Sequence, residues 1–158
     1  MATDDADAGA RQETPVRNPA LQRLDALAGA WAVEVAHPRV PTPITGGRVT
    51  FEWLEDSFLL QRTAPGNPDF PSSVAVIGGD DTTGRYTMQY FDSRGVARIY
   101  EMSLDPDTWR LWRQAPGFSQ RFTGTFADDG DTIVGSWELS RDGATWEHDF
   151  GLIYRKAS

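Results

Sequence analysis

The sequence predicts an all-β protein: an antiparallel up-and-down β-barrel of about ten strands, with a short N-terminal helix closing one end. After Gly29 the helical spacing of apolar residues stops, and short segments of alternating apolar and polar residues follow one another to the C-terminus. Links rich in Gly, Pro, Asn and Asp separate the segments, as tight turns require. A meander of this length exposes two edges unless it closes. We therefore expect a closed barrel, with an open sandwich as the alternative.

The chain divides into a tail and one domain. Residues 1–18 are rich in Ala, Asp, Thr, Arg and Pro and show no periodicity, so we expect a disordered acidic tail. The stretch 19–158 shows no further domain boundary and no internal repeat. A chain of 158 residues suits one domain with a tail.

The domain begins with the one segment that has helical spacing. Pro19 can occupy a first helical turn, and Leu21, Leu24 and Leu27 recur at helical intervals before Gly29 ends the pattern. Strands are then predicted near residues 30–37, 47–54, 57–64, 73–79, 84–91, 95–103, 108–114, 118–127, 131–140 and 145–155.

Composition excludes several classes of protein. The formal net charge of -8 argues against a nucleic-acid footprint and against docking on anionic lipid. The absence of Cys excludes disulfides, thiolate metal sites and a Cys nucleophile. The N-terminus is acidic where a signal peptide would be basic and then apolar, and no apolar run is long enough for a membrane helix. We therefore expect a cytoplasmic protein without nucleic-acid or membrane partners.

Most side chains that alternation places inside the barrel are apolar or aromatic, and the polar exceptions indicate a function. These exceptions are Arg62, Arg98, Gln120 and His148, with tyrosine hydroxyls beside them. A solid core would not hold two unpaired guanidinium groups, whereas a partly wet cavity would. There the arginines would bind an anionic head group while aromatic rings cover its apolar part. In the alternative, both arginines lie at the barrel rims with their charges in solvent. The predicted ligand-binding residues are Arg62, Tyr90, Arg98, Tyr100, Gln120, Trp137 and His148.

Two motifs at the ends of the barrel resemble the calycin superfamily. Gly29-Ala30-Trp31 opens the first strand, and Arg155 lies near the end of the last. Lipocalins carry a G-x-W on their first strand, with an arginine of the final strand packed across the Trp face. The resemblance therefore implies a structural role for Trp31 and Arg155 in closing the barrel. The strand number is closer to fatty-acid-binding proteins and nitrobindins than to eight-stranded lipocalins.

The C-terminal half also resembles a bacterial calycin-like family of unknown function. The resemblance spans roughly residues 20–156, is sharpest over 130–155, and implies the fold without an activity or ligand. The matching text is Phe91-Asp92-Ser93-Arg94-Gly95, Arg98-Ile99-Tyr100-Glu101-Met102, Gly124-Thr125-Phe126, Gly135-Ser136-Trp137-Glu138-Leu139-Ser140 and Asp142-Gly143-Ala144-Thr145-Trp146-Glu147-His148-Asp149-Phe150.

Two ligand-binding families differ from the chain at informative positions. Fatty-acid-binding proteins grip a carboxylate with an R-x-Y on the last strand, where this chain has Leu152-Ile153-Tyr154. Arg98 or Arg62 would have to replace that arginine. Nitrobindins bind haem through a late His followed seven residues on by an Arg, as His148 precedes Arg155 here. Their G-x-W-x-G-x-G pattern is absent, because Gly29-Ala30-Trp31 continues Ala32-Val33-Glu34-Val35.

Four functional hypotheses follow. The first is a barrel that binds a small apolar or amphipathic molecule, expected to be anionic, without chemistry of its own. The second is an enzyme of the isomerase or cyclase type, with His148 and Tyr90 or Tyr100 as acid and base. The third is a haem-binding peroxynitrite isomerase of the nitrobindin kind, with His148 as iron ligand. The fourth is an interaction module or homodimer that uses Trp109 or Trp112. Apart from haem we expect no cofactor, and with two histidines we expect no metal site.

Overall fold

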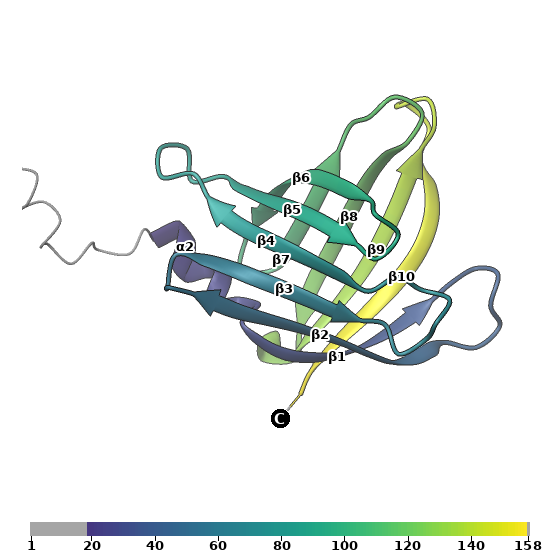
Figure 1. The fold of residues 1–158 in the computed structure, drawn as a ribbon, viewed down its shortest axis with the longest axis horizontal. Helices are drawn as coiled ribbons and strands as arrows, with labels where there is room; N and C mark the ends of the chain where they lie inside the picture. Colours follow the sequence, from purple (N-terminus) through teal and green to yellow (C-terminus); the bar gives the residue numbers. More distant parts are fainter. Residues whose placement is uncertain (1–18, 158) are drawn as a thin grey trace, which may run out of the picture.

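The computed structural model describes residues 19–157 and shows a closed barrel of ten antiparallel strands (Figure 1). The predicted tail, residues 1–18, lies outside the described residues, as does Ser158. Each strand pairs with its sequence neighbours, and the last strand pairs with the first, so the barrel prediction is confirmed and the sandwich alternative is wrong. The strands are β1 (Gly29–Ala36), β2 (Ile44–Leu54), β3 (Phe58–Ala64), β4 (Ser73–Gly79), β5 (Tyr86–Asp92), β6 (Ala97–Leu104), β7 (Thr108–Arg113), β8 (Ser119–Ala127), β9 (Thr132–Ser140) and β10 (Glu147–Lys156).

A short helical segment closes one end of the barrel, as the sequence predicts. It consists of α2 (Pro19–Arg23) and the 3₁₀ turn η1 (Leu24–Ala26), and Figure 1 shows α2 beside the ends of β2, β3 and β4. Leu24 and Leu27 are fully buried against the barrel interior. The indole nitrogen of Trp31 donates a hydrogen bond to the Leu27 carbonyl, at 2.8 Å. Apolar burial and this hydrogen bond together hold the segment over the barrel end.

The residue that covers Trp31 is Lys156, and the prediction for Arg155 is wrong by one position. Trp31 pairs with Lys156 across β1 and β10, and Ala32 pairs with Arg155. Directly opposed residues of an antiparallel pair share a face, so Lys156 lies on the inner side and Arg155 on the outer. Lys156 Nζ lies 5.2 Å from the Trp31 ring centroid, whereas Arg155 forms an ion pair with Glu34 at 2.8 Å.

Aromatic packing fills the middle of the barrel, and a pair of glycines makes room for it. Gly124 and Gly135 lie directly opposite each other on β8 and β9, under the ring of Phe122. That ring packs edge-on against Trp109, with centroids 4.9 Å apart, and lies tilted against Trp137, with centroids 5.2 Å apart. A Cβ at position 135 would lie 2.5 Å from Phe122 Cε2, so the close approach of ring and backbone requires glycine there.

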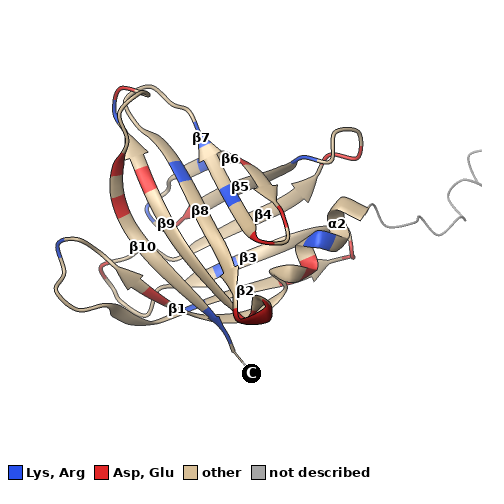
Figure 2. Cartoon of the chain, turned by 180° about the vertical axis from the view of Figure 1, so that it is seen from behind, with Lys and Arg blue, Asp and Glu red and all other residues tan. Residues whose placement is uncertain are grey.

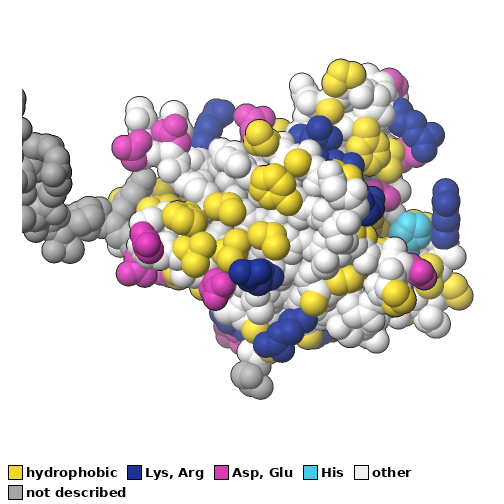
Figure 3. Space-filling model, in the orientation of Figure 1, with side chains coloured by type: hydrophobic (Ala, Val, Ile, Leu, Met, Phe, Trp, Pro, Cys, Tyr) yellow, Lys and Arg dark blue, Asp and Glu magenta, His cyan; other side chains and the backbone are white. Residues whose placement is uncertain are grey.

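The outer surface is polar with scattered apolar side chains. Figure 2 shows acidic and basic residues along the strands and in the loops. On β8 and β9, Arg121 Nε pairs with Glu138 Oε1 at 2.9 Å. Figure 3 shows hydrophobic side chains interspersed with polar ones on the opposite face. Within residues 19–157, no helix has the length and apolar character needed to span a bilayer.

Candidate ligand-binding cavity

The barrel contains a cavity of about 400 Å³ that reaches the end opposite α2. Its mouth is bordered by residues of the connecting loops and strand ends, among them His37, Phe70, Arg94, Phe118 and Asp149. Volumes of about 300–1,000 Å³ are typical of small-molecule sites. The barrel is therefore closed by its helix at one end and hollow toward the other.

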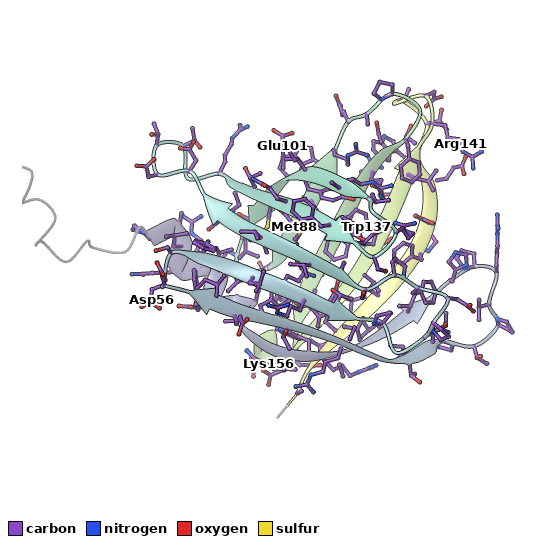
Figure 4. All side chains as sticks on the ribbon, viewed as in Figure 1. Asp56, Met88, Glu101, Trp137, Arg141 and Lys156 are labelled. Carbon is purple, nitrogen blue, oxygen red and sulfur yellow. The ribbon has the colours of Figure 1, made fainter. Side chains whose placement is uncertain are left out.

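The inner wall of the cavity is largely aromatic and aliphatic. Met88, Trp109, Phe122, Trp137 and Tyr154 all contribute to it. Figure 4 shows Met88 and Trp137 lying within the ring of strands. Ring contacts continue from Trp109 to Tyr154, with centroids 5.9 Å apart. Burial raises the pKa of the Tyr154 hydroxyl, so that group is neutral at physiological pH. The wall suits the apolar part of a ligand.

A polar cluster lies on the cavity wall formed by β6 and β8. The Oε1 atom of Gln120 accepts a hydrogen bond from Arg98 Nη1 at 3.2 Å and another from the Tyr100 hydroxyl at 2.9 Å. The Arg98 guanidinium also lies 5.3 Å from the Phe118 ring centroid. Burial raises the pKa of Tyr100, which therefore keeps its proton as a donor. No acidic side chain in the described part of the chain forms an ion pair with Arg98.

A second polar group lies near the mouth and is internally neutralised. Arg94 Nη2 lies 2.7 Å from Asp92 Oδ2, which also accepts a hydrogen bond from the Tyr90 hydroxyl at 2.8 Å. The hydrogen bonds from Arg94 hold the pKa of Asp92 well below its usual range. Burial, reinforced by the bond to Asp92, raises the pKa of Tyr90 to about 12. The charge of Arg94 is thus compensated within the protein, unlike that of Arg98.

Five of the seven predicted ligand-binding residues line this one cavity: Tyr90, Arg98, Tyr100, Gln120 and Trp137. The alternation on β5, β6, β8 and β9 predicted their inward direction correctly. The structure brings them together from four strands, with the arginine and the glutamine in direct contact.

Arg62 does not belong to the cavity, so its predicted inward direction is wrong. Leu59 pairs with Ile77, and both are fully buried. On β3 the inner face therefore carries Leu59 and Gln61, and Arg62 points outward with 60% of its side chain exposed. Its nearest acidic partner is Glu52, on the outer face of β2, at 3.8 Å.

His148 is also outside the barrel, because β10 contains a bulge that alternation cannot show. His148 pairs with Glu138, but Phe150 pairs with Trp137, so the register shifts by one residue between them. Phe150 faces the cavity, and Asp149 borders the mouth. His148 is exposed, and its Nδ1 lies 3.2 Å from Ser136 Oγ.

The position of His148 removes the basis of two hypotheses. A haem inside the barrel could not be ligated by an exterior imidazole, and the predicted His148–Tyr90 and His148–Tyr100 acid–base pairs do not form. His37 borders the mouth, but its Nδ1 accepts a hydrogen bond from the Arg39 amide at 3.1 Å. The predicted haem ligand, His148, therefore does not lie inside the barrel. Over residues 19–157 there is also no cluster of three or more metal-ligating side chains.

Of the two tryptophans predicted to contact a partner protein, only Trp112 lies at the surface. Trp109 is 1% exposed and packs inside the barrel, so it cannot contact a partner protein. Trp112 is half-buried and borders a groove on the outer face of β5, β6 and β7.

Sequence reasoning did not select most of the residues that line the cavity, and three polar examples are Gln61, Thr63 and Asp149. A signal for the first two existed in the β2–β3 hairpin. Leu54 pairs with Phe58, which places Leu59 opposite Trp53 and Gln61 opposite Phe51. Had the turn register been fixed first, the buried face of β2 would have fixed the face of β3.

The closed ten-stranded meander and its end-on cavity define the chain as a calycin-like β-barrel. Several solved structures share this fold, including one from M. tuberculosis and a fluorescent protein. "Rv2717c from M. tuberculosis" matches with a TM-score of 0.59 and 20% identity, over 89% of this chain and 98% of that chain. The wild-type fluorescent protein UnaG matches with a TM-score of 0.50 and 11% identity, over 85% of this chain and 99% of that chain. Neither a protein-family model nor a curated protein matches this sequence.

Proposed function

We propose that this protein binds a small amphipathic anion inside the barrel, with the anionic group at Arg98. The observation that carries the proposal is the half-buried guanidinium in an aromatic cavity, without an acidic partner among residues 19–157. A desolvated charge without a counter-charge is unfavourable. A ligand that brings a carboxylate or sulfonate would compensate it and would form strong, charge-assisted hydrogen bonds.

The remainder of the cavity suits the apolar part of such a ligand. Trp137 and Phe150 stack with ring centroids 6.5 Å apart, and both line the cavity. Burying an apolar body against such rings is favourable by about 25 cal/mol for each Å² removed from water. The aromatic wall would thus supply most of the affinity for the ligand, and Arg98 would orient its anionic group.

A titration with 1-anilinonaphthalene-8-sulfonate, an aromatic anion whose fluorescence rises in apolar surroundings, tests the proposal. Arg98→Met should weaken binding by about tenfold or more, since a hydrogen-bonded charge contributes about 1.5–3 kcal/mol. Arg62→Met is the matched control, because it removes an arginine from the outer face of the same barrel and should leave affinity unchanged. Equal affinities of Arg98→Met and wild type, or no binding by wild type, would contradict the proposal.

A further inference from the structure

Gln120 is the side chain that holds Arg98 in place. It lies on β8, is 8% exposed, and reaches two residues of β6. Its Oε1 accepts hydrogen bonds from both the Arg98 guanidinium and the Tyr100 hydroxyl. Because the guanidinium can only donate, the amide oxygen and not the amide nitrogen must face it. The orientation of the amide is therefore fixed.

In this orientation, the hydrogen-bonding groups of Gln120 and Arg98 that remain free are all donors. The Gln120 amide nitrogen forms no hydrogen bond with another side chain or backbone group in the described range, and Arg98 has further N–H groups beyond the one that Gln120 accepts. A group that only accepts hydrogen bonds, such as a carboxylate, sulfonate or phosphate, complements such a set.

A comparison of Arg94 and Arg98, two of the arginines that line the cavity, shows the effect of a neutral partner. Arg94 is held by the Asp92 carboxylate, which cancels its charge. Arg98 is held by an amide, which orients the guanidinium and leaves its charge uncompensated. Asp149 borders the same mouth, but it forms no ion pair with Arg98. The two arginines therefore differ in the charge of the partner side chain: Arg94 has a carboxylate and Arg98 a neutral amide.

We propose that Gln120 sets the charge selectivity of the cavity: its neutral amide positions Arg98 without neutralising it, so the cavity selects ligands that end in an acceptor-only anion. This inference rests on the proposed function and identifies the residue that determines its specificity. Gln120→Glu keeps the shape and both accepted hydrogen bonds, but it adds a counter-charge. Gln120→Leu keeps a similar volume and removes both hydrogen bonds, but it leaves Arg98 charged.

These two variants separate selectivity from a purely structural role. If Gln120 served only packing and hydrogen bonding, Gln120→Glu would be the milder change in every measurement. If Gln120 sets charge selectivity, Gln120→Glu should be the milder change for stability, but Gln120→Leu should be the milder change for anion binding. Thermal unfolding should therefore rank Gln120→Glu above Gln120→Leu, while the preference for an anion should be retained by Gln120→Leu and lost by Gln120→Glu.

Isothermal titration of decanoate and decanol measures that preference with one chain length. We expect wild type to bind decanoate about tenfold or more tightly than decanol, in line with a charge-assisted contact of about 1.4 kcal/mol or more. In Gln120→Leu, the logarithm of the ratio between the decanol Kd and the decanoate Kd should fall by less than half. Gln120→Glu should abolish the preference and change decanol affinity by less than about threefold.

The outcomes distinguish this inference from the function on which it rests. If decanoate binding depends on Arg98 but Gln120→Glu keeps the preference, or Gln120→Leu loses as much as Gln120→Glu, the inference about Gln120 is overturned and the proposed function stands. If decanoate fails to bind wild type, or binds Arg98→Met equally well, both fail. A double variant checks that Gln120→Glu acts through Arg98. In an Arg98→Met background, Gln120→Glu should change the preference for decanoate over decanol by no more than about threefold.

Discussion

Asp92 links the rim of the cavity to its wall through two short hydrogen-bonded contacts. Its side chain is fully covered, accepts a hydrogen bond from Tyr90, and pairs with Arg94. Both partners stabilise the ionised carboxylate, which is why its pKa is lowered in the folded protein. A carboxyl group whose pKa is lower in the folded than in the unfolded state stabilises the fold wherever it is ionised.

The contribution of Asp92 to stability should therefore disappear in acid. It is fully present above the unfolded-state pKa of about 3.9 and is lost as the pH falls toward the lower folded-state value. Urea unfolding of wild type and Asp92→Asn should show a stability difference at neutral pH that shrinks at pH about 3. A difference that stays constant over this range would contradict the assigned hydrogen bonds.

The sequence identified polar side chains that interrupt the apolar strands. It predicted less well whether each of these side chains points into the barrel or out of it. Arg98 and Arg62 look equivalent in the sequence, since both interrupt an alternating strand. They differ because the adjacent Leu59 and Leu60 allow either face of β3 to be the inner one. The register of the β2–β3 hairpin places Leu59 on the inner face, and this turns Arg62 outward. The direction of a side chain on an ambiguous strand depends on its neighbours in space, which a single strand does not contain.

At the scale of the elements, the paired glycines of β8 and β9 determine how closely the strands approach the central ring. Gly135 is buried, and a methyl group there would overlap Phe122, which has Trp109 and Trp137 on its other sides. The ring cannot retreat without displacing the wall of the cavity. Overpacking of this kind usually costs about 1–3 kcal/mol.

We therefore expect Gly135→Ala to destabilise the protein by about 1–3 kcal/mol in denaturant unfolding. Gly78→Ala is the matched control, because Gly78 lies in strand β4 with nothing within 4 Å of its added Cβ and should be neutral or slightly stabilising. The cost at Gly135 should fall in a Phe122→Leu background, which gives the methyl group space. Equal effects of the two alanine variants would contradict the packing described.

The strands themselves could be predicted because each is bounded by turn residues that the sequence displays. The largest error in a strand start is at β2, predicted at residue 47 and observed at Ile44. The bulge in β10 could not be predicted, because its extra residue, Asp149, has no turn or glycine signal. That one residue moved His148 from the inside to the outside and removed the haem and acid–base hypotheses.

At the scale of the whole molecule, the barrel combines a sealed end with a hollow one. Closure of β10 onto β1 removes free sheet edges, and α2 with Leu24 and Leu27 seals the end near Trp31. Apolar packing is concentrated at that end and in the middle, while polar groups that could recognise a ligand lie toward the open end. The meander and its helix follow from sequence periodicity. The hollow depends on side-chain packing across the barrel, which periodicity does not describe.

The most direct test of the account is a crystal structure of the protein with decanoate. We predict that the alkyl chain lies along the aromatic wall beside Trp137 and that the carboxylate lies within hydrogen-bonding distance of the Arg98 guanidinium and the Gln120 amide nitrogen. A decanoate bound on the outer surface, or one inside the barrel with its carboxylate away from Arg98, would contradict the account.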